Sequence, residues 1–153
     1  MTRRTLRDRA FQSFWRMRRP ATLGVRGVVL DDRGRVLLVR HTYTPGWHFP
    51  GGGVERGETC AVSLRRELLE EAGVEAAAED MHLVSVHANH AFFPNDHVLL
   101  YRIEQWARGT PLQNGEIAEI GFFDPLNPPE GVSGGTNRRL TEIFGGVAAS
   151  DTW

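Results

Sequence analysis

The chain has 153 residues, of which 41% are hydrophobic and 24% are charged. This is the composition of an ordinary folded domain, and it excludes disordered, collagen-like and low-complexity chains. The net charge is −1, yet all 18 basic residues are arginines, and seven of them fall within residues 1–20 beside a single aspartate. The remaining residues carry eleven arginines against eighteen acidic residues, so a basic segment precedes an acidic one.

No stretch of the chain approaches the roughly 20 apolar residues that a membrane-spanning helix needs. Residues 1–20 also lack the uninterrupted apolar core of a secretory signal. The one cysteine, Cys60, has no partner for an intrachain disulfide, which fits a reducing compartment. The sequence therefore predicts a cytoplasmic protein that has no membrane partner.

Residues 3–19 predict an amphipathic, arginine-rich helix that Pro20 ends. Its apolar stripe favours packing against the rest of the chain, or a contact within a homodimer, because a bare stripe would form an unusual exposed patch. A membrane-surface helix and a contact with RNA or nucleotide phosphates stay open as alternatives. We treat residues 1–20 as this helix and residues 21–153 as one domain. The stripe consists of Leu6, Ala10, Phe11, Phe14 and Trp15.

Beyond Pro20 the pattern changes to short apolar runs. GVRGVVLDD and RVLLVRH, separated by residues 31–34, predict a β-hairpin with a glycine in its turn. Residues 44–57 contain two prolines and five glycines and predict a loop, which a helix from Thr59 to Ala72 follows. Because helices and strands interleave without a regular βαβ rhythm, we expect an α/β domain with a mixed sheet between helices. The other predicted elements are strands at 83–87, 97–106 and 117–123 and a helix at 137–144.

The helix predicted at 59–72 carries three glutamates on one face. At about 100° per residue, its apolar side chains form one arc, whereas Glu67, Glu70 and Glu71 fall on the opposite face, away from the core. Residues spaced at i, i+3 and i+4 have Cβ atoms roughly 5–6 Å apart, so three ionised carboxylates repel one another unless a cation lies among them. All-oxygen ligation selects a hard divalent ion such as Mg²⁺ or Mn²⁺.

A Glu-rich helical turn alone is more often a solvated surface, and the preceding loop changes that balance. The glycines at 51–53 let the backbone approach a ligand closely. Glu58 adds a fourth carboxylate at the start of the helix, and Arg66 can pair with Glu70 one turn later. These features together favour a metal and phosphate site.

The spacing of these residues resembles the Nudix hydrolase family. Gly52, five residues, Glu58, seven residues and then the run from Arg66 to Val74 (RELLEEAGV) match every defined position of the Nudix box. The resemblance implies an α/β/α sandwich with a mixed β-sheet. It also implies metal-dependent hydrolysis of a pyrophosphate linkage in a nucleoside diphosphate derivative or a nucleoside triphosphate, with negligible hydrolysis without the metal.

The resemblance assigns roles to the box residues. Glu67 and Glu70 are expected to serve both metal binding and catalysis, and Arg66 is expected to orient them. Glu71, Glu58 and the carbonyl of Gly51 are expected to complete the metal site, and Gly52 and Gly53 to contact the substrate.

Residues outside the box supply further candidates. Glu116 or Glu119 resembles the downstream glutamate that some family members use as a general base or metal ligand, although either also fits ordinary surface charge. Arg40 is a candidate for gripping a substrate phosphate, with a salt bridge as the alternative. Phe92, Phe93 or Trp47 is a candidate for stacking on a base, with simple packing as the alternative.

His87, His90 and His97 lie within eleven residues of one another. Alternate side chains of a strand point to opposite faces, so a shared metal site is not expected, and the three are expected to be partly exposed loop residues.

Two functional alternatives stay open. The arginine-rich segment motivates removal of pyrophosphate from RNA 5′ ends, and a Nudix-like module that senses a nucleotide without cutting it is the other.

Overall fold

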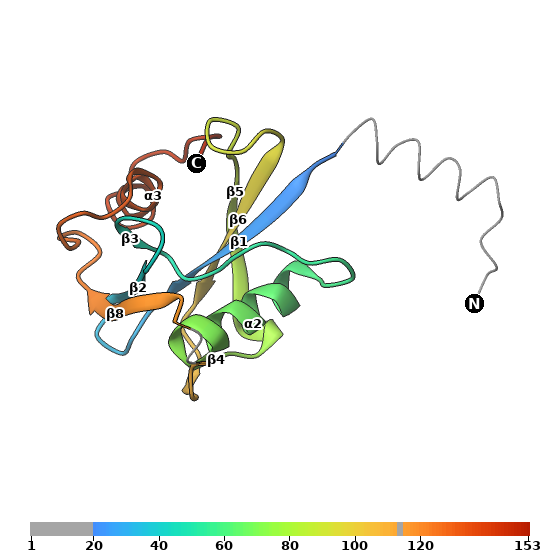
Figure 1. Ribbon diagram of the computed structural model, residues 1–153. Helices are drawn as coiled ribbons and strands as arrows, with labels where there is room; N and C mark the ends of the chain where they lie inside the picture. Colours follow the sequence, from blue (N-terminus) through green and yellow to red (C-terminus); the bar gives the residue numbers. More distant parts are fainter. Residues whose placement is uncertain (1–19, 113–114) are drawn as a thin grey trace, which may run out of the picture.

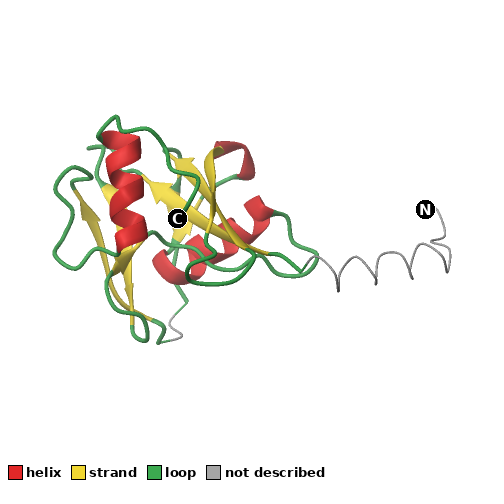
Figure 2. Ribbon diagram, turned by 90° about the horizontal axis from the view of Figure 1, so that it is seen from above, coloured by secondary structure: helices red, strands yellow, loops and turns green. Residues whose placement is uncertain are grey.

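The computed structural model describes residues 20–112 and 115–153, so the helix predicted at 3–19 lies outside the described residues. Strands lie between two helices, α2 (Cys60–Ala72) and α3 (Gly134–Phe144) (Figure 1). This is the predicted α/β/α arrangement with a mixed sheet, and Figure 2 shows the two helices on different sides of the strands. No helix in the described ranges is long and apolar enough to cross a membrane.

The strands form two three-stranded sheets rather than one. In the first, β1 (Thr22–Val29) runs parallel to β6 (Asp96–Ile103), and β6 runs antiparallel to β5 (Met81–Ala88). In the second, β2 (Val36–His41) lies antiparallel between β3 (Trp47–His48) and β8 (Ile117–Phe123). A short ladder joins β4 (Val74–Glu75) to β7 (Ala107–Arg108), and a 3₁₀ turn (Ala78–Asp80) precedes β5.

The predicted hairpin of residues 24–41 is correct in its turn and wrong in its pairing. Gly34 has φ 73°, and its N–H donates to the carbonyl of Asp31 at 3.0 Å, which closes the turn. Only one bridge, Leu30 to Val36, then joins the two segments. The reason is that both edges of β1 are already occupied. One pairs with β6, and on the other the N–H groups of Val25 and Gly27 donate to residues 52 and 50 of the glycine loop.

Capping residues explain where the helices begin and end. The Thr59 hydroxyl accepts from the N–H of Val62 at 3.2 Å, and Gly73 ends α2 in the left-handed conformation with φ 63°. Helix α3 begins three residues before the predicted Asn137. The Ser133 hydroxyl accepts from the N–H of Thr136 and caps the helix, so Gly134 and Gly135 form the first turn.

Two apolar clusters fill the space between the strands and the helices. Side chains of β1 alternate between them: Val25 and Val29 pack with Leu64 and Leu68 of α2, whereas Val28 packs with Leu140 of α3. Burial on both faces explains the continuous apolar sequence of β1. With both helices fixed in this way, the start of α3 and the glutamate face of α2 border one cavity.

Candidate active site

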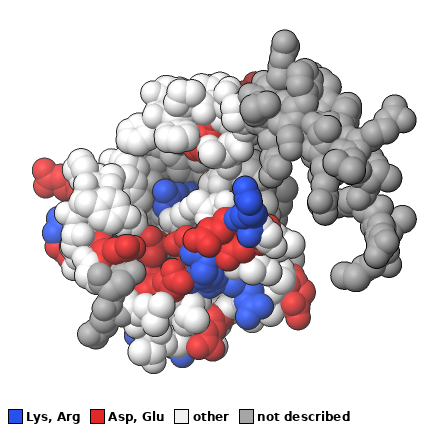
Figure 3. Space-filling view, turned by 45° about the vertical axis from the view of Figure 1, so that its right-hand side comes forward, with Lys and Arg blue, Asp and Glu red and all other residues white. Residues whose placement is uncertain are grey.

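A cavity of about 640 Å³ opens where the glycine loop, α2 and the start of α3 meet. Figure 3 shows acidic side chains gathered in a band beside a hollow in the surface, with a basic side chain inside the hollow. The charged or titratable side chains that line the cavity include Arg26, His41, Glu67, Glu71 and Glu116. Gly51, Gly52, Gly53 and Phe92, all predicted site residues, line it as well.

Backbone contacts with β1 hold the glycine loop in place. The N–H of Val25 donates to the Gly52 carbonyl at 2.9 Å, and Arg26 Nη1 donates to the Gly51 carbonyl at 2.5 Å. Gly51 has φ 139°, and a Cβ there would collide with the Val25 carbonyl, so only glycine fits. Arg26 was missed in the sequence analysis, although a charged residue inside the apolar run GVRGVV was a usable signal.

Glu71 lies beneath this loop rather than on an exposed face. Its side chain is 7% exposed, its Oε2 accepts from the N–H of Gly51 at 2.8 Å, and its Oε1 lies 3.5 Å from His41 Nε2. Burial raises the pKa of Glu71 to about 7, against the lowering effect of the Gly51 hydrogen bond and Arg26. The helical wheel placed this carboxylate away from the core correctly, but the loop that covers the face was not visible in the sequence.

Glu67 lies against the next residue of the loop. A Cβ built on Gly52 would lie 2.6 Å from Glu67 Cδ, so the absence of a side chain at 52 makes room for this carboxylate. The Glu67 side chain is 16% exposed. Its pKa is raised, mainly by burial and also by the nearby charge of Glu70, while Arg66 opposes the shift.

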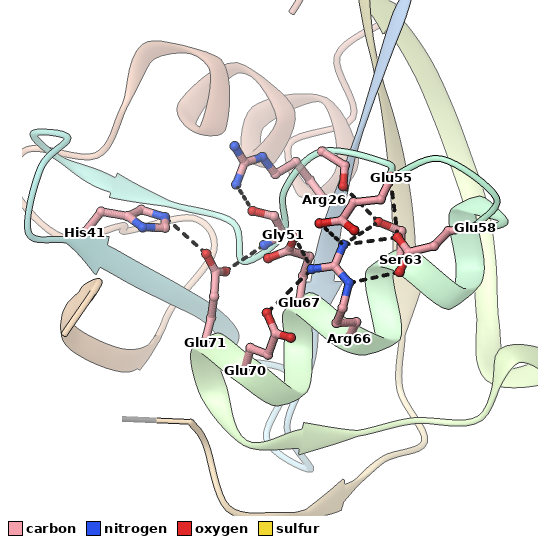
Figure 4. Close-up of polar contacts among 11 residues, drawn as sticks. Arg26, His41, Gly51, Glu55, Glu58, Ser63, Arg66, Glu67, Glu70 and Glu71 are labelled. Atoms are coloured by element: carbon pink, nitrogen blue, oxygen red, sulfur yellow. Dashed lines mark hydrogen bonds and ion pairs between the residues drawn. The ribbon is translucent and has the colours of Figure 1, made fainter. Parts of the chain in front are cut away.

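Arg66 links the carboxylates of the box (Figure 4). It donates to Glu58 through Nε at 3.0 Å and through Nη2 at 3.1 Å, to Glu67 through Nη1 at 2.8 Å, and its Nη1 lies 3.5 Å from Glu70 Oε2. These hydrogen bonds hold the pKa of Glu58 below its usual range and raise that of Arg66. Ser63 ties the helix to the loop by donating to the Gly53 carbonyl at 3.0 Å.

The donor chemistry of this face fits a hard divalent cation. Glu67 and Glu71 are carboxylates in a largely buried wall, and burial raises the pKa of both, so their anionic forms would gain from added positive charge. As the side chains stand in residues 20–112 and 115–153, no three His, Cys, Asp or Glu residues converge closely enough to hold a metal ion. Arg66 engages Glu67 and Glu70, and the Gly51 amide engages Glu71.

The two candidates for a general base lie in different places. Glu116 lines the cavity together with Glu67 and Glu71. Glu119 forms an ion pair with Arg40, and neither residue lines the cavity. The expectation that Arg40 grips a phosphate is therefore not matched by its position: its side chain crosses to β8, and its guanidinium lies 5.7 Å from the Trp47 ring centroid.

The aromatic candidates also lie in different places. Trp47 is 8% exposed and packs edge-on against Phe123, with ring centroids 4.8 Å apart, so it belongs to the core and is not available to a base. Phe92 is 86% exposed and lines the cavity, whereas Phe93 is 55% exposed and does not line it. Local sequence pattern cannot distinguish these roles, because Trp47 and Phe92 both follow polar, loop-forming segments.

Several cavity residues were not predicted. His41 follows Arg40 directly, its side chain is 8% exposed, and its Nδ1 is buried without a hydrogen-bond partner. Burial, together with the positive charge of Arg26, lowers the pKa of His41 to about 4, so its ring is neutral near pH 7. Arg138 and Trp153 also line the cavity, and nothing in their local sequence indicates it.

Two of the three histidines, His87 and His97, differ from the expectation of loop residues, and His97 lies within β6. His87 is 1% exposed and lies within β5, so it is a buried residue rather than a loop residue. The ring centroids of His90 and His97 lie 5.3 Å apart. The three do not form a shared site among the described residues.

Comparisons with known proteins find a family model and relatives that match most of the chain. The NUDIX domain model matches residues 20–137. A putative 8-oxo-dGTP diphosphatase of Bacillus subtilis is 41% identical over 127 residues, which cover 82% of each chain. Nucleoside diphosphate-linked moiety X motif 6 of Xenopus laevis is 36% identical over 87 residues, which are 54% of this chain and 40% of that protein.

Shorter matches are found with RNA pyrophosphohydrolases. An RNA pyrophosphohydrolase of Halorhodospira halophila is 49% identical over 47 residues, which are 31% of this chain and 26% of that protein. Among solved structures, a MutT NUDIX hydrolase from Burkholderia pseudomallei superposes with a TM-score of 0.69 at 22% identity. That match covers 81% of this chain and 98% of the other, and it supports the fold.

Proposed function

The chain belongs to the Nudix hydrolase family, and from that premise we propose that it hydrolyses a pyrophosphate linkage with a divalent metal ion. The proposed substrate is a nucleoside diphosphate derivative or a nucleoside triphosphate, and the proposed location is the cytoplasm. The observation that carries the proposal is the contact of Glu67 and Glu71 with successive residues of the glycine loop at one wall of the cavity.

We propose that Glu67, Glu70 and Glu71 hold Mg²⁺ or Mn²⁺, with Glu58 as the supporting carboxylate and the Gly51 carbonyl as a further oxygen ligand. Such an ion, when bound, would neutralise charge on the diphosphate and lower the pKa of a bound water. Arg66 orients the carboxylates through the hydrogen bonds described above. The backbone of Gly52 and Gly53 lies open to the cavity for substrate contact.

Glu116 is the residue that we propose as general base. It lines the cavity with Glu67 and Glu71, whereas the partner of Glu119 is Arg40 on the neighbouring strand. A carboxylate at this position can accept a proton from water within the cavity. Glu116→Gln should therefore lower kcat by 10²- to 10⁴-fold, the usual contribution of a positioned base, while Glu119→Gln should have a much smaller effect.

The test of the proposed function is turnover of a nucleotide panel with Mg²⁺, with Mn²⁺ and with neither ion. The panel contains nucleoside triphosphates, nucleoside diphosphate sugars and dinucleoside polyphosphates. Wild type is compared with Glu70→Gln and with Glu130→Gln, an exposed glutamate that does not line the cavity. We expect metal-dependent turnover by wild type and Glu130→Gln and a large loss for Glu70→Gln. Equal rates for all three proteins would overturn the proposal.

Two alternatives are separated by the same assay. Short matches with RNA pyrophosphohydrolases support adding a 5′-triphosphorylated RNA to the panel. If deletion of residues 1–18 abolishes turnover of RNA while sparing small nucleotides, RNA becomes the favoured substrate. A non-catalytic nucleotide sensor would bind members of the panel without turning any of them over.

A further inference from the structure

Residues 150–153 are attached to the edge of β5 near the cavity. The N–H of Ala88 donates to the Asp151 carbonyl at 2.8 Å, and the N–H of Trp153 donates to the Ala88 carbonyl at 2.9 Å. These bonds form a parallel bridge between Ala88 and Thr152. Figure 1 shows this segment beside α3 and the end of β5. The segment is therefore held as a short extension of the first sheet.

Buried polar side chains of β5 and α3 hold the same segment. His87, 1% exposed, donates through Nδ1 to the Ser150 carbonyl at 2.7 Å. Arg139, 0% exposed, donates to the Thr152 carbonyl at 2.9 Å and to Glu142 at 2.5 Å, and Glu142 in turn accepts from the N–H of Ser150 at 3.0 Å. Buried ionisable groups are costly unless they are paired, so the position of this segment is strongly specified.

The anchors fix the orientation of the Trp153 indole. The Arg139 guanidinium lies over the ring, 5.5 Å from its centroid, and the His87 ring meets it edge-on at 5.8 Å. The pyrrole edge lies on the backbone of Gly135, where a Cβ would come within 2.7 Å of Trp153 Cδ1. The half-buried Trp153 lines the cavity that Glu67 and Glu71 also line.

We infer that Trp153 is a substrate-binding residue and that its indole stacks on the nucleobase of the substrate. This inference rests on the proposed function, because it places a nucleotide in the cavity with its phosphates toward the glutamates. Among the residues that the structure describes, Trp153, Phe92 and Tyr43 are the large aromatic side chains that line the cavity. Trp153 is the better platform, because it is held by contacts with His87 and Arg139, whereas Phe92 is 86% exposed and Tyr43 is 68% exposed. A rigid aromatic platform binds a planar base at low entropic cost.

The experiment measures binding of AMP, GMP, CMP, UMP and ribose 5-phosphate by titration calorimetry. Wild type is compared with Trp153→Phe, which keeps an aromatic face, and with Trp153→Leu, which keeps apolar bulk without one. We expect Trp153→Leu to weaken nucleotide binding roughly tenfold or more, within the range of base–aromatic stacking. Trp153→Phe should retain most of the affinity, and ribose 5-phosphate should bind all three proteins equally.

Two further variants separate stacking from structural damage. Gly135→Ala keeps the indole but displaces it from the helix backbone, so it should weaken binding of the four nucleotides and leave binding of ribose 5-phosphate unchanged. Phe93→Leu replaces a 55% exposed aromatic that does not line the cavity, and its binding should match wild type. Equal losses for Trp153→Phe and Trp153→Leu, or a matching loss with ribose 5-phosphate, would overturn the stacking role.

Turnover distinguishes this inference from the proposed function. If wild type hydrolyses nucleotides and Trp153→Leu leaves their KM unchanged, the role of Trp153 is overturned and the hydrolase proposal stands. If no nucleotide is hydrolysed but base-dependent binding still requires an aromatic residue at 153, the hydrolase proposal is overturned and the role of Trp153 stands. We expect a raised KM and a kcat within about threefold of wild type for Trp153→Leu.

Discussion

The Glu67 carboxylate occupies the space that a side chain at Gly52 would need. A Cβ at residue 52 would lie 2.6 Å from Glu67 Cδ, and the clash involves the end of a side chain rather than backbone. Gly52 therefore has a specific role in placing a candidate metal ligand. That role differs from the conformational freedom for which glycines in loops are usually selected, because Gly52 does not have a positive φ.

Gly52→Ala is expected to lower activity while leaving the fold nearly intact. The methyl group displaces the Glu67 carboxylate, and disturbing the support of a metal ligand typically costs about 10- to 100-fold in metal affinity or activity. Since the displaced atoms end a flexible side chain, the melting temperature should fall by only a few degrees. Steady-state kinetics, Mn²⁺ titration and thermal unfolding measure the three quantities.

Gly24→Ala is the matched control for Gly52→Ala. Its added Cβ meets only ordinary contacts, 3.7 Å from the Gly52 carbonyl and 3.8 Å from Val98. Activity and stability should stay close to wild type. If Gly52→Ala behaves like this control, Glu67 does not need its present position for catalysis.

Gly51→Ala should act on stability instead. Gly51 has φ 139°, and its Cβ would collide with the Val25 carbonyl and lie 3.0 Å from Arg26 Cα, which are backbone atoms that cannot rotate away. We expect a loss of about 2–4 kcal/mol in the free energy of unfolding. Urea denaturation measures it, and a variant as stable as Gly52→Ala would contradict the backbone contact.

The helix and its capping residues could be predicted from sequence because their determinants are local. Thr59 and Gly73 flank a segment in which apolar residues recur about every 3.6 positions. These signals predict the observed helix, Cys60–Ala72. The direction of the Glu67 and Glu71 face relative to the leucines follows from the same period. The burial of that face under the glycine loop cannot be predicted in the same way, because it depends on the pairing of the loop with β1.

Long-range pairing explains the remaining differences. Residues 24–41 have the pattern of a hairpin, but β1 gains more from a parallel partner, β6, some 70 residues later, and no local signal encodes that choice. Trp47 and Phe92 are both aromatic residues near loops, and only the tertiary structure separates core from cavity. Trp153 reaches the cavity through contacts with β5 and α3 that no local pattern predicts.

The homodimer contact predicted for residues 3–19 stays a prediction.

Arg66 should support activity by holding three carboxylates in place at once. Arg66→Ala leaves Glu58, Glu67 and Glu70 without their shared cation. We expect kcat/KM to fall by at least 10- to 100-fold and Mn²⁺ affinity to fall with it. Arg66→Lys restores the charge but not the forked geometry, so it should recover only part of the activity.

The matched control is Arg65→Ala, which removes an exposed arginine from the neighbouring position of the same helix. Its kinetics should resemble those of wild type, and both variants should be compared at the same ionic strength because exposed charges are screened by salt. If Arg65→Ala lowers kcat/KM as much as Arg66→Ala does, the effect reflects net charge rather than orientation of the glutamates.

The dependence of stability on pH tests the anchoring role of His87. Burial lowers its pKa, and the positive charge of Arg139 lowers it further, while the Ser150 carbonyl, Glu142 and Asp151 act in the opposite direction. The unfolded chain has a histidine pKa of about 6.5, so below that pH it binds a proton that the folded chain does not accept as readily. The stabilisation is therefore complete above about pH 6.5 and is lost as the pH falls through that value toward the folded-state pKa.

Urea denaturation at pH 7.5 and 5.5 should show a smaller loss of stability for His87→Gln than for wild type. One proton changes the free energy of unfolding by at most about 1.4 kcal/mol per pH unit, which bounds the difference in slope. His82→Gln removes an exposed imidazole from the same strand and controls for the loss of a histidine. His87→Gln should also be less stable than wild type at pH 7.5, because the bond to Ser150 is weakened. If its pH dependence matches that of wild type, His87 is not the buried neutral anchor of residues 150–153.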